Sequence, residues 1–222
     1  MVERMTCKAC RGMLKIIRVE EGEVFAIDCP NCRNEVVSEK MKKANLPKRY
    51  LSARFSNSKM PTQDYESVCR SLSSWSESPQ GFVTLSGPPG SGKTHILACM
   101  AAQMIDKGIS ARYLSLIDLF DDERRRIGRQ PVRELYLLES ADVLLVDELG
   151  AGIGTDFEKD IVHRLVARRY DEMKPTLFAT NFRLGTSTKA SLENSGRVSP
   201  HTFSRLSTAT NFETVESFRG GQ

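Results

Sequence analysis

The sequence predicts an α/β fold: a three-layer α/β/α sandwich around a five-stranded, mainly parallel sheet, preceded by a small cysteine-rich module. Three observations predict it. A glycine-rich loop lies between an apolar strand and an apolar helix. A second apolar strand ends in two acidic residues, as strands do at the ligand-binding edge of an open parallel sheet. Four cysteines form two closely spaced pairs near the N-terminus.

The composition indicates one full α/β domain with a small appendage. The chain has 222 residues, of which 40% are hydrophobic and 27% are charged. Its formal net charge of +4 permits a nucleic-acid partner without requiring one. No run approaches the roughly 18 apolar residues of a membrane span, and the N-terminus lacks the apolar core of a signal peptide. We therefore expect a cytoplasmic protein with no membrane partner, in which cysteines bind metal or stay reduced.

The cysteine pairs predict a zinc-binding ribbon over residues 1–38. Its four candidate ligands are Cys7, Cys10, Cys29 and Cys32. Each pair encloses two residues, and 18 residues (11–28) separate the pairs, a spacing that suits the tetrahedron of thiolates around Zn²⁺. Residues 14–19 and 24–27 read as two short strands joined by a turn. Disulfides and a redox pair are the alternatives. A module this small depends on its metal to fold.

Residues 39–58 are polar and basic, and we expect them to form a linker. Their lysines and arginines are a weak signal for nucleic acid, and a solvated linker explains them more simply. The α/β domain is then expected over residues 59–222. Its first element is a helix over residues 64–75, because Tyr65 and Leu72 recur on one side at helical spacing.

The strongest signal in the chain is a phosphate-binding loop that matches the pattern G-x-x-x-x-G-K-[ST]. The loop reads Gly87, Pro88, Pro89, Gly90, Ser91, Gly92, Lys93 and Thr94. A strand over residues 82–85 precedes it and a helix over 95–104 follows, so backbone N–H groups and the helix N-terminus can face a phosphate. We expect Lys93 to contact the β- and γ-phosphates and Thr94 to bind Mg²⁺. His95 adjoins this nucleotide-binding loop, as a packing residue rather than a catalytic one.

The second half of the predicted site follows a buried strand over residues 143–146. Asp147 is placed to hold Mg²⁺ directly or through water, and Glu148 to polarise the attacking water as a general base. A loop start is the alternative for this acidic pair. The remaining strands are expected over 113–116, 176–180 and 212–215, with a short helix around residues 204–206.

These motifs resemble the DnaC/DnaI-type replicative helicase loaders and their relatives, the IstB-type transposition ATPases of the AAA+ class. The resemblance covers roughly residues 46–219. The matching segments are Leu46–Tyr50, the phosphate loop with His95–Ala98, Leu144–Gly150, Ala179–Asn181, Ser204–Leu206 and Ser217–Arg219. The resemblance implies an AAA+ core without a helical lid. Loaders of the DnaI type also carry an N-terminal zinc-binding module that contacts the helicase.

The resemblance also implies roles for three polar residues beyond the loop and the acids. Asn181 matches the residue that orients the attacking water, with a turn former as its alternative. Arg205 matches an arginine finger that reaches the γ-phosphate of a neighbouring subunit, and Arg219 matches a second nucleotide sensor in its own subunit. Surface ion pairs are the alternative for both arginines. A finger in trans implies an ATPase that hydrolyses ATP across an oligomer interface.

Single-stranded DNA contacts are implied for residues 121–130 and 152–157. The expected contacts are Arg124, Arg125, Arg126, Arg129, Thr155 and Phe157. Ile127 stands where the family has an aromatic ring, which removes a base-stacking partner. The arginines would compensate electrostatically, and a solvated helix face is the alternative.

The resulting hypothesis is an ATP-dependent loader of a hexameric, DnaB-type replicative helicase that assembles on single-stranded DNA during replication initiation, in a bacterium or a phage. Its cofactors would be ATP, Mg²⁺ and Zn²⁺. One alternative is an IstB-like helper of DNA transposition, which the zinc ribbon argues against. The other is a non-catalytic helicase-binding adaptor, which would not need Lys93, Asp147, Glu148 or Arg205.

Overall fold

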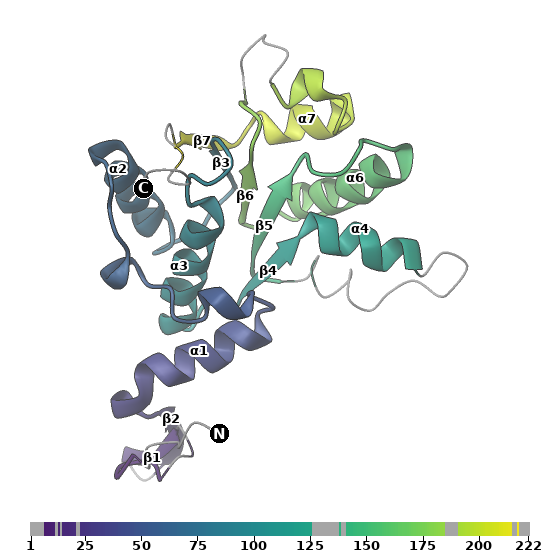
Figure 1. Cartoon of the computed structure of the whole chain (residues 1–222). Coiled ribbons are helices and arrows are strands. Elements are labelled where there is room, and N and C mark those ends of the chain that lie inside the picture. The colour runs from purple at the N-terminus through teal and green to yellow at the C-terminus, as the bar shows by residue number, and fades with distance from the viewer. Residues whose placement is uncertain are drawn as a thin grey trace.

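The computed structural model describes residues 7–11, 13, 15–20, 23–125, 138, 141–184, 191–214 and 217. Two sheets form within these residues. The small one is an antiparallel hairpin of β1 (Lys15–Glu20) and β2 (Glu23–Asp28). The large one has five strands in the order β4-β5-β6-β3-β7, and every neighbouring pair in it is parallel. The predicted α/β class is confirmed (Figure 1).

Helices cover both faces of the large sheet, and this makes the three layers. Its strands are β3 (Phe82–Ser86), β4 (Ala111–Ser115), β5 (Val143–Leu149), β6 (Thr176–Thr180) and β7 (Thr210–Glu213). One face carries α1 (Arg33–Lys43), α2 (Gln63–Trp75) and α3 (Lys93–Asp106). The other carries α4 (Leu116–Arg125), α6 (Asp156–Asp171) and α7 (Pro200–Leu206). Short 3-10 helices lie at Pro30–Cys32, Lys48–Tyr50, Phe55–Asn57 and Glu193–Ser195.

The apolar runs of the central strands are buried on both sides. In β5, Val143 and Leu145 pack with α3 on one face, while Leu144 and Val146 pack with α6 on the other. This alternation follows from the two-residue period of a strand, and burial on both faces explains why the strand reads as one continuous apolar stretch.

Side-chain caps set the start of three helices. Thr62 accepts a hydrogen bond from the Tyr65 N–H at the start of α2, and Ser199 accepts one from the Thr202 N–H at the start of α7. Thr155 and Glu158 form a reciprocal capping box at the start of α6. These caps fix where the chain leaves β5 and where α7 begins, so they position the loops around the carboxyl edge of the sheet.

Residues 39–58 differ from the linker expected there. They hold the last part of α1 and two 3-10 helices, and they contribute Met41, Ala44, Leu46 and Ala53 to the same core cluster as α3. The Ala44 carbonyl accepts a hydrogen bond of 2.8 Å from the Tyr113 N–H of β4. Sparse apolar residues among many charged ones are enough to anchor the segment, and composition alone hides them. The division into residues 1–38, 39–58 and 59–222 stays a prediction, and α1 runs across its first boundary.

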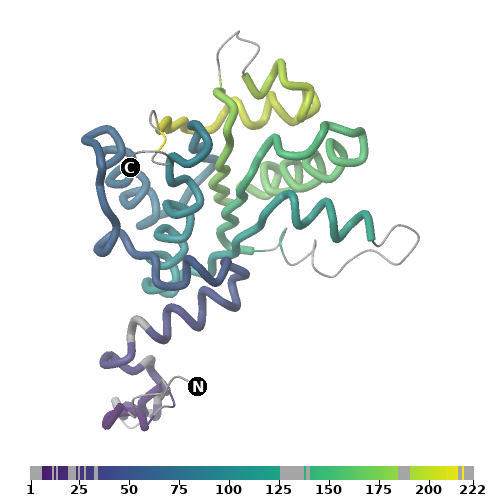
Figure 2. Tube along the Cα trace, in the orientation of Figure 1, coloured from purple at the N-terminus to yellow at the C-terminus, as the bar shows by residue number. Residues whose placement is uncertain are grey.

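The cysteine module lies at the far end of α1 from the large sheet, as the purple end of the tube in Figure 2 shows. Its cysteines form a small cluster of their own with Val36 and Ile16. No helix in the described part of the chain is long and apolar enough to cross a membrane.

Candidate nucleotide and metal sites

The phosphate loop, residues 87–94, joins β3 to α3 at the carboxyl edge of the sheet. Space around it is tight: a Cβ on Gly87 would lie 2.0 Å from the Thr214 hydroxyl oxygen. Gly92 precedes the first turn of α3 with a φ of 83°, which favours glycine. The loop therefore requires glycine at these two positions, and a glycine-rich loop ahead of a helix can turn backbone N–H groups toward an anion.

Lys93 is almost buried, at 8% exposure, beneath the phosphate loop. Its ammonium donates hydrogen bonds of 2.8 Å to the carbonyls of Gly87 and Pro88. The charge is thus held at the centre of the loop, where it can pair with a phosphate. A buried ammonium beside carbonyl dipoles is well suited to bind a multiply charged anion.

Thr94 and Asp147 meet across the sheet edge. The Thr94 hydroxyl donates to Asp147 Oδ2 at 2.7 Å, and the Tyr113 hydroxyl donates to the same oxygen at 3.0 Å. Asp147 is 4% exposed. Burial, together with the negative charge of Asp147, raises the pKa of Tyr113. Hydroxyl and carboxylate oxygens are the ligands that Mg²⁺ prefers, so this pair fits a magnesium ion.

Glu148 follows directly and has an unusual backbone. Its φ is 63°, and the pairing of β5 with β6 shifts register between Val146 and Leu149. The Ser115 hydroxyl donates a hydrogen bond of 2.8 Å to Glu148 Oε2. Burial raises the pKa of Glu148 above its ordinary value, although the Ser115 hydrogen bond opposes the shift. A solvent-accessible carboxylate on a strained backbone at this edge can serve as a general base.

A cavity of about 390 Å³ brings most of the predicted nucleotide residues together. Its lining includes Pro89, Gly90, Gly92, Lys93, Thr94, His95, Asp147, Glu148 and Asn181. Gly87, Pro88 and Ser91 belong to the loop but do not line this cavity.

Sequence reasoning missed four residues of the site. Arg49 and Tyr50 also line the cavity, with the Arg49 guanidinium carbon 4.8 Å from the centre of the Tyr50 ring. The Tyr50 ring lies 6.2 Å from the His95 ring. The lead-in at residues 46–50 was a signal for the first two, whereas nothing in the spacing pointed to Tyr113 and Ser115.

His95 lies at the edge of this cavity as a packing residue. Its Nε2 is 2.6 Å from the Ser58 hydroxyl, and burial lowers the pKa of the imidazole. The contact also ties the segment that follows α1 to the first turn of α3.

The predicted arginine finger, Arg205, lies apart from the lining of this cavity. The guanidinium carbon of Arg205, on α7, lies 5.8 Å from the centre of the Tyr170 ring, and Arg205 donates to the His201 carbonyl at 3.4 Å. Arg205 is therefore not part of its own chain's cavity lining. Arg219 lies outside the described residues, but the Ser217 hydroxyl donates to the Pro89 carbonyl at 2.8 Å. The preceding segment thus reaches the phosphate loop.

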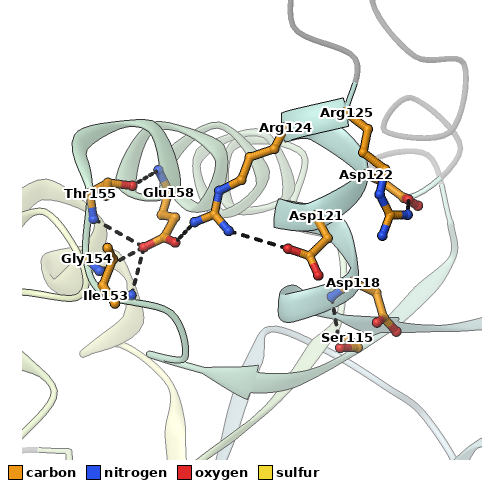
Figure 3. A network of polar contacts seen from close by, with 10 residues as sticks. All are labelled: Ser115, Asp118, Asp121, Asp122, Arg124, Arg125, Ile153, Gly154, Thr155 and Glu158. Carbon is orange, nitrogen blue, oxygen red and sulfur yellow. Dashed lines mark hydrogen bonds and ion pairs between the residues drawn. The ribbon is translucent and has the colours of Figure 1, made fainter.

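The described candidates for DNA contact all have partners within the chain (Figure 3). Arg124 pairs with the carboxylates of Glu158 and Asp121, and Arg125 pairs with Asp122. The Thr155 hydroxyl caps α6, and Phe157 packs partly buried against the core beneath that helix. Arg126 and Arg129 lie outside the described residues. The sequence signal was a basic run, and it could not reveal that acidic neighbours already pair with two of its members.

The four cysteines of the ribbon converge on one point. Their sulfur atoms all lie within 4.8 Å of one another, with Cys7 and Cys29 3.8 Å apart and Cys10 and Cys32 3.7 Å apart. A regular tetrahedron of thiolates at Zn–S distances of about 2.3 Å places its sulfurs about 3.8 Å apart. Disulfide sulfurs would lie about 2.05 Å apart, so the distances favour a metal. Backbone N–H groups of Cys10 and Ala9 lower the pKa of the Cys7 thiol to about 6, whereas burial raises the pKa of the Cys29 and Cys32 thiols.

The fold and the phosphate loop define a nucleotide-binding protein of the P-loop class. Residues 31–190 match the model of a family described as IstB-like ATP binding protein. This match covers well over half of the chain, and the chain belongs to that family.

The chain is also similar to proteins of DNA replication. It is 31% identical over 107 residues to the replicative helicase loader DnaC of Escherichia coli strain K12, which is 47% of this chain and 44% of that protein. The chain thus matches about half the length of this curated relative. The crystal structure of the DnaC helicase loader has a TM-score of 0.65 at 22% identity, over 76% of this chain and 99% of that one. A putative primosome component from Streptococcus pyogenes has a TM-score of 0.66 at 20% identity, over 86% and 100%. These two structures show the shared fold.

Proposed function

We propose that this protein is an ATP-dependent loader of a hexameric, DnaB-type replicative helicase. The observation that carries the proposal is a complete set of phosphate loop, buried lysine and paired acids, in a chain whose sequence resembles a replicative helicase loader. An ATP-binding domain of this kind does mechanical work by alternating between nucleotide states, and placing a ring on DNA requires such work.

Each residue of the cavity has a proposed task in ATP hydrolysis. Lys93 and the backbone of residues 87–94 bind the phosphates, while Thr94 and Asp147 hold Mg²⁺, which neutralises developing negative charge in phosphoryl transfer. Glu148 accepts a proton from the attacking water, and Asn181 orients that water. The cation–π pair of Arg49 and Tyr50 lines the same cavity and can contact the base or ribose of the nucleotide.

The position of Arg205 supports hydrolysis across a subunit interface. Arg205 lies on α7 away from its own cavity lining, so it can complete the site of a neighbouring copy rather than its own. A guanidinium supplied in this way can accelerate phosphoryl transfer by about 10³- to 10⁵-fold. Arg219 would report on the nucleotide of its own subunit, which agrees with the contact between Ser217 and the phosphate loop.

The remaining partners are proposed on charge and composition. Single-stranded DNA would bind over the basic end of α4 and the loop before α6, where Arg124 points toward Glu158 and Thr155 while Arg125 lies on the other side of α4 (Figure 3). The ribbon would recruit the helicase. Its hairpin exposes Ile17, Val19 and Val24 to at least 64%, an apolar surface that a protein partner can cover.

A second candidate is an ATPase helper of DNA transposition, favoured by the description of the matching family. Such a helper would remodel double-stranded DNA and a transposase instead of a helicase. A helicase-binding adaptor without catalysis is the third. It would show no ATP turnover, although Lys93, Asp147 and Glu148 are in place.

A pull-down with purified DnaB-type helicase tests the loader proposal. The full chain should retain the helicase when zinc is bound and lose it in the Cys7→Ser, Cys10→Ser double variant. Cys69→Ser is the matched control, because Cys69 lies in α2 and outside the cluster. Absence of helicase binding by the zinc-loaded chain, together with binding to double-stranded DNA, would move the assignment to transposition.

A further inference from the structure

The loop between β5 and α6 is organised by a single buried carboxylate. Glu158 is 2% exposed, and its Oε2 accepts hydrogen bonds from three successive backbone N–H groups, those of Ile153, Gly154 and Thr155, at 3.1, 2.8 and 3.2 Å. These bonds hold the pKa of Glu158 below its ordinary value, although burial alone would raise it. The carboxylate thus replaces the missing backbone partners of a tight turn.

The second oxygen of Glu158 has a different partner. Among the described residues, Oε1 pairs with the Arg124 guanidinium from the last turn of α4 (Figure 3). Arg124 also reaches Asp121 at 3.4 Å, and its side chain remains 45% exposed. One face of the guanidinium is therefore held by the protein while solvent reaches the rest.

The opposite side of the loop is fixed by other contacts. Arg197 donates to the Gly152 carbonyl, and a Cβ on Gly154 would come within 2.7 Å of the Gly196 carbonyl oxygen. Glu158 itself cannot leave, because three N–H groups depend on it. Of the described groups that contact this carboxylate, Arg124 is the one charged side chain, and it is partly exposed to solvent, so it can exchange the carboxylate for another anion.

We propose that Glu158 is a positioning residue that holds Arg124 in a latch, and that Arg124 exchanges this carboxylate for a phosphate of single-stranded DNA. Within the proposed function, this pair sets the affinity for single-stranded DNA, because a DNA phosphate can bind Arg124 only after displacing the Glu158 carboxylate. The inference rests on the proposed binding of single-stranded DNA beside α4.

A glutamine at position 158 separates the two jobs of the carboxylate. Its amide oxygen still accepts the three loop N–H groups, whereas its NH₂ group faces the guanidinium and repels it. Glu158→Gln should therefore keep the loop and release Arg124. Arg124→Ala should remove both the latch and the phosphate contact, so the double variant should behave like Arg124→Ala alone.

The test is fluorescence anisotropy of labelled oligo(dT) titrated with the full chain and a non-hydrolysable ATP analogue at several salt concentrations. Glu158→Gln should tighten binding by about 3- to 10-fold, as expected when one competing ion pair is removed. Arg124→Ala should weaken binding and reduce the slope of log K against log salt by about 0.7, the value for one lost phosphate contact on a single strand. Glu172→Gln is the control, because it breaks an arginine–carboxylate pair at the other end of α6.

The outcomes separate the latch from simple structural support. If Glu158→Gln binds DNA no more tightly than the wild type, the exchange is refuted; weaker binding in both Arg124 backgrounds would assign Glu158 to loop structure alone. Should Glu158→Gln fail to fold, the salt slope of Arg124→Ala decides, and an unchanged slope overturns the proposal. A wild-type chain that binds no single strand at any salt would instead refute the proposed function, and the latch with it.

Discussion

At Glu148 the backbone adopts a left-handed conformation with a φ of 63°, while the side chain accepts a hydrogen bond from Ser115. A non-glycine residue in this region carries a strain of about 1–2 kcal/mol. Such strain is common where a side chain must be aimed at a reaction rather than into the core. In this state Ser115 holds the carboxylate, so a water would have to compete with that hydroxyl for the proposed base.

The first prediction concerns the pH dependence of ATP turnover. Glu148 must be ionised to accept a proton, and burial raises its pKa, so activity should fall with decreasing pH at a value above the ordinary 4.5. Ser115→Ala removes a hydrogen bond that lowers this pKa and should shift the acid limb to higher pH. Steady-state ATPase rates from about pH 5 to 8 measure the shift. Ser71→Ala, at an exposed position, is the control. A shift of the acid limb of Ser115→Ala to lower pH would contradict the assignment of Glu148 as the general base.

A second prediction concerns Gly87 and the shape of the phosphate loop. An alanine Cβ there would overlap the Thr214 hydroxyl at 2.0 Å, so Gly87→Ala should distort the phosphate loop and abolish nucleotide binding. Gly108→Ala is the matched control, since Gly108 also has a positive φ but no neighbouring atom within 4 Å of the place that a Cβ would take. The control should lose about 1 kcal/mol of stability and keep its affinity. Titration with a fluorescent ATP analogue measures the nucleotide affinity of both variants. Equal affinity in Gly87→Ala and Gly108→Ala would contradict the need for glycine at position 87.

Among the elements, α1 contributes to the core although the composition of residues 39–58 is polar and basic. Met41 is completely buried in the core cluster that also contains α3. Met41→Ala should therefore lower the free energy of unfolding by about 2–5 kcal/mol, as large-to-small core changes do. Lys42→Ala, one residue along and exposed, should change it by less than about 0.5 kcal/mol. Urea denaturation measures both; equal small effects would mean that this part of α1 behaves as a linker.

The ribbon is expected to depend on its metal, whereas the α/β domain is not. The cysteines cluster separately from both large core clusters among the described residues. Removing Zn²⁺ with a chelator, or mutating Cys29 to Ser, should unfold the hairpin and leave ATP binding intact. Metal content and nucleotide affinity measured on the same sample check this. Loss of ATP binding on chelation would show that the two parts fold together.

Local spacing explains what was predictable from the sequence. The cysteine pairs, the phosphate loop and the acidic strand end each lie within a few residues, and short apolar runs together with the family resemblance indicated all five strands of the large sheet, although β4 and β7 begin two residues earlier than predicted. What was missed depends on partners far along the chain. Tyr113 bonds to Asp147 34 residues away, and Arg124 pairs with Glu158 at the same separation. Neither pair leaves a pattern in the sequence, because only the fold brings its members together.

For the whole molecule, the parallel sheet gathers its chemistry at one edge. Lys93 and Asn181 follow β3 and β6, Asp147 lies near the carboxyl end of β5, and all three line one cavity because parallel strands end on the same side. The ribbon lies at the far end of α1, so partner recruitment and ATP hydrolysis are proposed at separate ends of the molecule (Figure 1). Arg205 lies outside its own chain's cavity lining, so the proposed hydrolysis in trans would need assembly for full turnover.

Helicase loading itself is tested by ATP-dependent transfer of a purified DnaB-type helicase onto circular single-stranded DNA, measured by co-sedimentation of the helicase with the circle. Transfer is expected for the wild type with ATP and not for Lys93→Ala, because the ammonium proposed to pair with the phosphates is gone. Glu148→Gln should bind ATP without turning it over. Equal helicase transfer by Lys93→Ala and by the wild type, or by the wild type with and without ATP, would contradict an ATP-dependent loader.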